Sequence, residues 1–180
     1  MKDKEEQAIV IDYLPYGYPL ERKMMPIAQA VGKKNFTLLE LVPRRGVKMD
    51  VGEEVYIGEG KRDKVYYILG KLDYGKISES GKKFFEEFVE KRVTEDEKKF
   101  VDFFNTSQAI NTRLHQLELI PGFGKKHTQA ILDQRKEKPF ESFEDLKRRI
   151  SNLPDPRTAI VKRIVEELSG EERHLLFVSN

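Results

Sequence analysis

The chain has 180 residues, of which 38% are hydrophobic and 36% are charged, and its formal net charge is +2. This balance is typical of a soluble protein large enough for one medium domain or two small ones. The absence of cysteine excludes disulfides, thiolate zinc sites and cysteine nucleophiles. The sequence has no apolar run of membrane-spanning length, about 18 residues, and its start lacks the apolar stretch of a signal peptide. We therefore expect a cytoplasmic protein without membrane contact.

Residues 1–75 are expected to form a small β domain. Five short segments rich in Val, Ile, Tyr and Phe are separated by turn-prone stretches. The segments are residues 6–14, 26–31, 36–43, 55–58 and 65–72. Gly32–Asn35 and Lys61–Lys64 are expected to be hairpin loops. Five short strands without a helical period predict a small barrel or curled sheet, because closure removes exposed edges.

Residues 76–105 are expected to form connecting helices. Phenylalanines recur there at helical spacing, and Thr94–Glu97 has the pattern of a capping box. The stripe consists of Phe84, Phe85, Phe88, Phe100, Phe103 and Phe104. A ligand pocket or partner groove would use such a stripe, but packing of a helix pair between two domains is the favoured interpretation.

The chain is expected to be helical from residue 106 to residue 168. Ile110, Leu114 and Leu117 recur at the spacing of one apolar helix face. Further on, Ser142 with Asp145 predicts a second capping box. The predicted helical domain spans residues 106–170.

The end of the chain contains clear helix signals and one ambiguous segment. Asp155-Pro156 predicts an N-cap followed by proline at the first helical position, and Ser169-Gly170 predicts where that helix ends. Residues 171–180 are expected to be a C-terminal tail. Its HLLFV segment fits either a returning strand or a tail packed on the core.

Positive charge is concentrated in one part of the chain. Residues 113–163 carry 12 basic and 7 acidic side chains, whereas residues 164–180 carry 1 basic and 4 acidic ones. A local patch matters more than net charge for binding a polyanion. The basic segment therefore favours a polyanion as partner.

The most informative segment, Leu119–Leu132, contains Gly-Phe-Gly followed by two lysines. Gly122 and Gly124 permit positive φ and close approach of another backbone. A helix expected to begin near Lys125 would present unpaired N–H groups and the positive end of its dipole, which suits a phosphate. Phe123 is expected to turn inward. We call residues 119–125 the first hairpin.

This segment resembles the helix-hairpin-helix family, which has an apolar residue, then Gly-apolar-Gly, and Ala six residues after the second Gly. Gly122, Gly124 and Ala130 match that pattern, as do Ile120 and Phe123. The resemblance extends over residues 106–168. It implies a second hairpin at residues 152–157, but prolines and Asp155 stand there in place of glycines, so we expect that copy to complete the core.

The resemblance implies non-catalytic and largely sequence-independent binding of DNA or RNA through backbone phosphates. The residues expected to contact nucleic acid are Pro121, Gly122, Phe123, Gly124, Lys125, Lys126, Thr128 and Arg157. No cofactor or metal is expected. A protein–protein adaptor that uses the hairpins structurally is the alternative.

The whole chain also resembles an uncharacterised archaeal family of nucleotide- or nucleic-acid-binding proteins. In that family an OB-like barrel precedes a tandem helix-hairpin-helix domain, which implies an α+β fold. A barrel of this kind holds single strands by stacking and charge. The candidate residues are Tyr13, Tyr16, Tyr18, Arg44, Arg45 and Lys48.

Two signals for catalysis are incomplete. Glu21-Arg22-Lys23 resembles the core of a nuclease family, but Ile27 stands where that active site needs an aspartate. The three histidines are scattered without metal-ligand spacing. We therefore expect no enzymatic activity.

Overall fold

The computed structural model describes residues 4–178. Within them the chain forms two compact units. The strand unit comprises residues up to 87 together with those from 167 onward, and the helical unit comprises residues 88–166. The expected α+β class is confirmed, since the described residues contain five β-strands and five α-helices.

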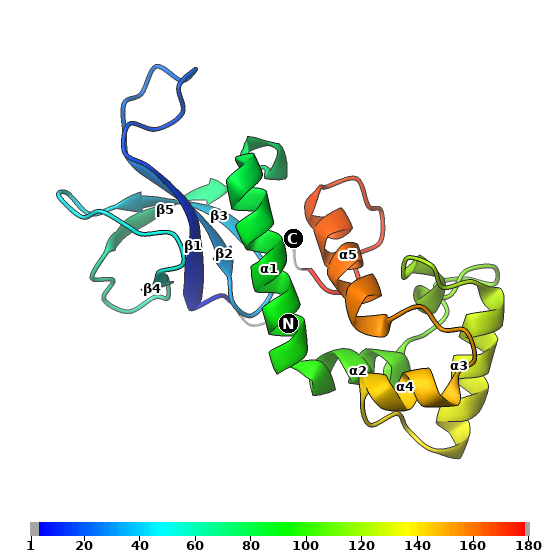
Figure 1. Ribbon diagram of the computed structural model, residues 1–180. Coiled ribbons are helices and arrows are strands. Elements are labelled where there is room, and N and C mark those ends of the chain that lie inside the picture. The colour runs from blue at the N-terminus through cyan, green and yellow to red at the C-terminus, as the bar shows by residue number, and fades with distance from the viewer. Residues whose placement is uncertain (1–3, 179–180) are drawn as a thin grey trace. The chain divides into compact units, whose positions relative to one another are not determined.

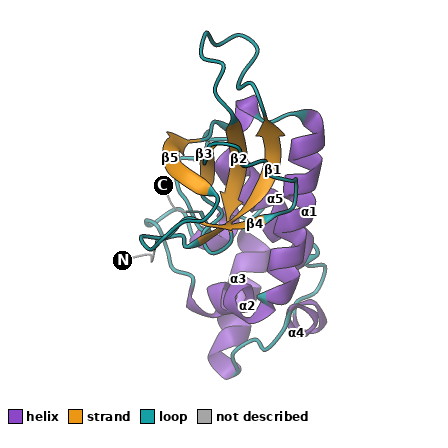
Figure 2. Cartoon of the chain, turned by 90° about the vertical axis from the view of Figure 1, so that its left-hand side faces the viewer, coloured by secondary structure: helices purple, strands orange, loops and turns teal. Residues whose placement is uncertain are grey.

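Five antiparallel strands form a curled half-barrel in the strand unit (Figures 1 and 2). They are β1 (Gln7–Leu14), β2 (Ile27–Gly32), β3 (Leu38–Pro43), β4 (Glu54–Tyr56) and β5 (Val65–Lys71). Their order in the sheet is β4-β1-β2-β3-β5. The central strand β2 is buried along its whole length and pairs with β1 on one side and with β3 on the other.

The five predicted strand segments are confirmed, but only one of the two predicted hairpin loops is. Gly32–Asn35 lies in the connection between β2 and β3, which pair directly. Lys61–Lys64 precedes β5, which pairs with β3, whereas β4 pairs with β1. The second loop therefore joins opposite edges of the sheet and is not a hairpin.

Aliphatic side chains fill the inside of the sheet. Val10, Ala30, Leu41 and Val65 have no exposed surface, and Met49 and Ile57 are nearly as buried. These residues come from four strands and two connections. The core therefore holds the sheet in its curled form through apolar burial.

The C-terminal segment is a packed tail and not a returning strand. A helix described below, α5, ends at Leu168 as predicted, and Gly170 follows with a φ of +84°. One carboxylate oxygen of the buried Glu167 accepts the amides of Leu176, Phe177 and Val178 at 2.8, 3.0 and 3.1 Å. These three bonds hold the tail against the end of the helix.

Five α-helices and two short 3-10 helices follow the strands. They are η1 (Tyr74–Lys76), α1 (Glu79–Glu95), α2 (Glu97–Thr106), η2 (Gln116–Leu119), α3 (Lys125–Glu137), α4 (Phe143–Arg149) and α5 (Pro156–Leu168). Phe85, Phe88, Phe100 and Phe104 of the predicted stripe are buried. Their burial supports core packing over an open groove.

Two helix predictions are wrong. Thr94 lies inside α1 and donates its hydroxyl hydrogen to the Glu90 carbonyl, so it does not cap α2. Residues 107–115 form an irregular loop with a bridge between Ala109 and His115. The predicted helix before the first hairpin is thus reduced to the four-residue η2.

Of the other two capping predictions, the one at Asp155-Pro156 agrees with the structure and the capping box at Ser142 is half formed. Ser142 accepts the Asp145 amide at 3.0 Å, although the Asp145 carboxylate turns back to the amide of Glu141. Helix α5 begins at Pro156, and Asp155 accepts the Arg157 amide at 3.2 Å. Helices α4 and α5 therefore each begin where a side-chain oxygen accepts an otherwise unpaired amide.

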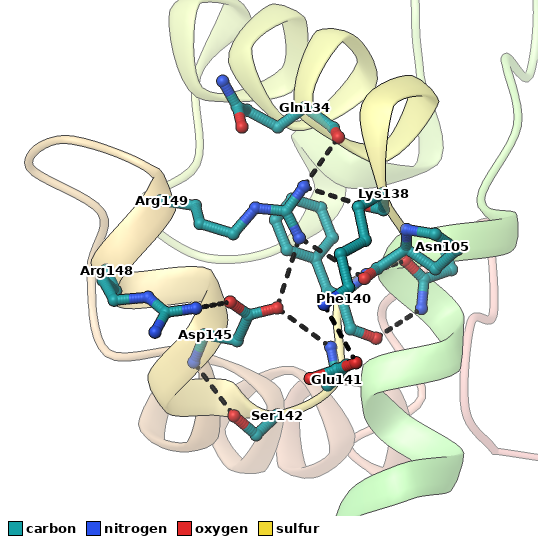
Figure 3. A network of polar contacts seen from close by, with 10 residues as sticks. Asn105, Gln134, Lys138, Phe140, Glu141, Ser142, Asp145, Arg148 and Arg149 are labelled. Atoms are coloured by element: carbon teal, nitrogen blue, oxygen red, sulfur yellow. Dashed lines mark hydrogen bonds and ion pairs between the residues drawn. The ribbon is translucent and has the colours of Figure 1, made fainter.

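Arg149 joins the end of α3 to α4 (Figure 3). Its guanidinium donates to the carbonyls of Gln134 and Lys138 at 2.7 and 2.6 Å and to Asp145 at 3.2 Å. The same group stacks on the Phe140 ring, 4.3 Å from its centroid. It thus satisfies the Lys138 carbonyl at the end of α3 and gives a second donor to the Gln134 carbonyl, which already accepts the Lys138 amide at 3.2 Å.

Candidate functional site

The first hairpin is a tight turn that requires glycine at position 122. Gly122 has a φ of +85°, and a β-carbon there would lie 3.1 Å from Cγ of Pro154 in the second hairpin. The amide of Phe123 closes the turn by donating to the Ile120 carbonyl at 3.0 Å. Gly122 is thus the point where the two hairpins meet.

Gly124 lies at the N-cap of α3 and faces open space. Its φ of −108° is ordinary, and a β-carbon there would meet no heavy atom within 4 Å. The first three amides of α3 belong to Lys125, Lys126 and His127, which precede the first i→i−4 bond, from Thr128 to Gly124. They form the positive end of a helix beside an unobstructed surface, which is the geometry that binds anions.

Two lysines flank these amides, but they differ in their surroundings. The Lys125 ammonium lies 3.2 Å from Glu118 and donates to the Arg113 carbonyl at 3.2 Å. The His115 amide and then Lys125 hold the pKa of Glu118 below its ordinary value. Lys126 is exposed, and no ion pair is recorded for it within residues 4–178. Among the described residues, Lys126 is therefore the cation without a competing partner, whereas Lys125, although its own side chain is exposed, is paired with the largely buried Glu118.

Phe123 and Thr128 lie inside the unit and support the hairpin from behind. Phe123 turns inward as predicted, with its ring 5.9 Å from the rings of both Phe104 and His127. The Thr128 hydroxyl donates to the Gly124 carbonyl at 2.9 Å. Both side chains are buried, so they hold the shape of the hairpin and do not form part of its exposed surface.

His127 connects the two hairpins, a role that its sequence context did not reveal. Its Nδ1 accepts the Gly124 amide at 3.4 Å, and its Nε2 lies 3.1 Å from the Asn152 carbonyl. The neutral tautomer with hydrogen on Nε2 satisfies both contacts. The i,i+3 spacing from Gly124 is the only local signal, because Asn152 is remote in sequence.

The second hairpin is not prepared for a phosphate contact. Asn152 has a φ of +55°, and Pro156 removes an amide at the start of α5. The guanidinium of Arg157 lies over the Phe143 ring, 5.6 Å from its centroid, and its Nε is buried. Arg157 therefore packs within the unit, and the expectation that this copy completes the core agrees with the geometry.

Part of the basic excess of residues 113–163 holds the fold together. Arg135 donates to the carbonyls of Phe104 and Ser107 at 3.0 and 2.9 Å. Arg163 is buried and donates to the Leu119 carbonyl at 3.3 Å, just before the first hairpin. Together with Arg149 these arginines are engaged inside the unit, so they add little to the exposed positive charge.

In the strand unit the six predicted contact residues divide into two groups. Tyr13 and Tyr18 are half-buried, and the Tyr18 hydroxyl donates to Glu40 at 2.7 Å while accepting from Gln29. Burial and Glu40 raise the pKa of Tyr18. The exposed members are Tyr16, Arg44, Arg45 and Lys48. Tyr18 is thus part of a polar cluster on the sheet, whereas the other group lies at the surface.

Comparison of the chain with known sequences and structures assigns it to a family. It belongs to the family described as protein of unknown function (DUF655), whose model matches residues 4–179. The chain is 42% identical over 176 residues to the uncharacterized protein MJ0038 of Methanocaldococcus jannaschii, covering 97% of this chain and 80% of that protein. The crystal structure of Af1531 from Archaeoglobus fulgidus matches with a TM-score of 0.81 at 43% identity, covering 97% of this chain and all of that one. The expected uncharacterised archaeal family is confirmed.

No helix within residues 4–178 is long and apolar enough to cross a membrane.

Proposed function

We propose that this protein binds nucleic acid without catalysis, through contacts of the first hairpin with backbone phosphates. The observation that carries the proposal is the start of α3. Three amides of its first turn lie beside the open face of Gly124, with Lys126 exposed next to them. Such a site binds a phosphate by hydrogen bonds and by charge, and neither contact depends on the base.

The proposal treats residues 106–168 as a helix-hairpin-helix domain with one functional and one degenerate hairpin. Gly122 supports this view, because its positive φ and its contact with Pro154 make the two hairpins a single packed pair. The first helix of the pair is reduced to η2 and an irregular loop, so the resemblance is closest from Ile120 onward. The curled sheet of the strand unit is proposed to be an OB-like barrel.

The test is a fluorescence-anisotropy titration of the full chain with single- and double-stranded DNA and RNA. We expect binding that weakens strongly between about 50 and 200 mM salt, since phosphate contacts release counterions. The double variant Lys125→Glu/Lys126→Glu should lose nearly all binding, because it places two carboxylates beside the phosphate. Lys136→Glu/Lys138→Glu, at the other end of α3, is the matched control for net charge and should retain most of the affinity.

Two outcomes would contradict the proposal. Equal losses in both double variants would show that only overall charge matters, and would contradict a specific hairpin contact. Absence of binding to all four ligands would overturn the proposal and would favour a protein adaptor. Circular dichroism of each variant establishes that the fold survives.

A further inference from the structure

Strand β5 contains two β-bulges, and each places a large side chain outside the strand ladder. Its pairing with β3 skips Tyr66 at one register shift and Leu69 at the other. A bulge leaves the extra residue unpaired and redirects its side chain. Both bulged residues are exposed, Tyr66 by 64% and Leu69 by 44%, whereas Val65 in the same strand is fully buried.

The ring of Tyr66 is supported from the side by Tyr67. The two rings meet edge to face, with centroids 5.3 Å apart and an interplanar angle of 70°. The Tyr67 hydroxyl lies 3.8 Å from the sulfur of Met25 in the connection between β1 and β2. Tyr67 is therefore anchored to that connection and limits the positions that Tyr66 can adopt.

Basic side chains stand at both ends of the exposed strip formed by Tyr66, Tyr67 and Leu69, although the Lys64 ammonium is paired with Glu53. Residues 61–71 include four basic side chains and one acidic one, with Lys71 at the far end of β5. Arg44 joins the near end, because its amide donates to the Lys64 carbonyl at 2.8 Å and its Nε to the Arg62 carbonyl at 2.7 Å. The β3–β4 connection, which also carries Arg45 and Lys48, thus begins against the start of β5.

We propose that the outer side of β5 binds an unpaired nucleic-acid strand, with Tyr66 stacking on a base and Leu69 packing beside it. This inference extends the proposed function to a second surface and rests on it. Exposed aromatic side chains between cations are the combination that holds single strands irrespective of sequence. A duplex offers no such contact, because its base faces are already stacked.

The same features argue against a protein strand as the occupant. A strand added to the sheet edge needs a regular row of amides and carbonyls, and two bulges within seven residues interrupt that row. Basic residues at both ends of the strip favour a polyanion. Strand β5 lies at the edge of the sheet, beside β3, as Figure 2 shows.

The test measures binding of the full chain to labelled single strands of about 12 nucleotides and to the matching duplex. Tyr66→Ala should weaken single-strand binding at least about five-fold and leave duplex binding unchanged. Tyr66→Phe keeps the ring and should bind like the wild type. Leu69→Ala should weaken single-strand binding to a smaller extent than Tyr66→Ala, and Leu20→Ala, at a 99% exposed position, is the matched control without effect.

The outcomes distinguish this surface from the first hairpin. If Tyr66→Ala binds single strands as tightly as the wild type while Lys125→Glu/Lys126→Glu does not, the β5 surface is overturned and the hairpin proposal stands. If only Tyr66→Ala loses single-strand binding and Lys125→Glu/Lys126→Glu also keeps its duplex binding, the β5 surface stands and the hairpin proposal fails. If Tyr66→Ala lost affinity equally for the single strand and the duplex, or if the wild type bound neither, the β5 surface would be overturned.

Discussion

At the scale of single residues, Gly122 and Gly124 have different reasons to be glycine. Gly122 combines a φ of +85° with a close neighbour in Pro154, so the folded state itself requires it. Gly124 has ordinary backbone angles and open space above it. Gly124 suits the N-cap of α3 better than alanine would, and its lack of a side chain leaves the first amides of that helix uncovered.

Alanine at each glycine separates folding from binding. Gly122→Ala should lower the free energy of unfolding by about 1–3 kcal/mol, because it strains the backbone and crowds Pro154. Gly124→Ala should lower it by less than about 1 kcal/mol. Its methyl group should nevertheless reduce nucleic-acid affinity by standing over the first amides of α3. Urea denaturation and anisotropy measure the two effects, and equal stability losses would contradict the assignment.

At the scale of elements, the strands could be predicted because each is a short β-branched or aromatic run between turn residues. The order of the strands and the two bulges in β5 could not, since both depend on pairing between distant segments. Residues 107–115 are predicted to be helical from their local pattern, but they form an irregular loop. Ile110 and Leu114 have helical spacing, but the Asn111 side chain accepts the Arg113 amide at 2.8 Å and the Ile110 and Asn111 amides turn to the Leu114 carbonyl. A local side-chain bond thus replaced the helix.

The candidate site was predictable in its glycines and lysines but not in its supporting contacts. The Gly-Phe-Gly spacing indicates the turn, the inward Phe123 and the start of α3. The pairing of Lys125 with Glu118 and the link from His127 to Asn152 arise between residues 7 and 25 positions apart, and only the fold brings them together. The same holds for Arg157, whose stacking on Phe143 removes it from the expected contact surface.

Arg149 allows a test of how α3 and α4 are joined. Arg149→Ala removes donors from two helix-end carbonyls and from the buried Asp145, so it should destabilise the protein by about 2–4 kcal/mol. Lys147→Ala on the same helix removes only an exposed pair with Glu144 and should change stability by less than about 0.5 kcal/mol. Thermal or urea unfolding compares them, and similar values for both variants would refute the role given to Arg149.

At the scale of the whole molecule, the charge distribution changes meaning once the fold is known. The excess of basic residues in 113–163 first indicated a polyanion partner, yet Arg135, Arg149 and Arg163 are bonded to backbone carbonyls. The proposed nucleic-acid contact in the helical unit is therefore limited to the first turn of α3 and its lysines. In the strand unit the proposed contact is the exposed side of β5, since Tyr13 and Tyr18 are half-buried.

An NMR titration can detect the proposed phosphate contact at the first hairpin, since it reports on individual backbone amides. The full chain, labelled with ¹⁵N, would be titrated with a short duplex and with a single strand at low salt. We expect the largest amide shifts at Gly124, Lys125 and Lys126, saturating with added nucleic acid and reversed by salt. Saturating shifts that leave these three amides unmoved, or no shifts at all, would contradict a phosphate contact at the first hairpin.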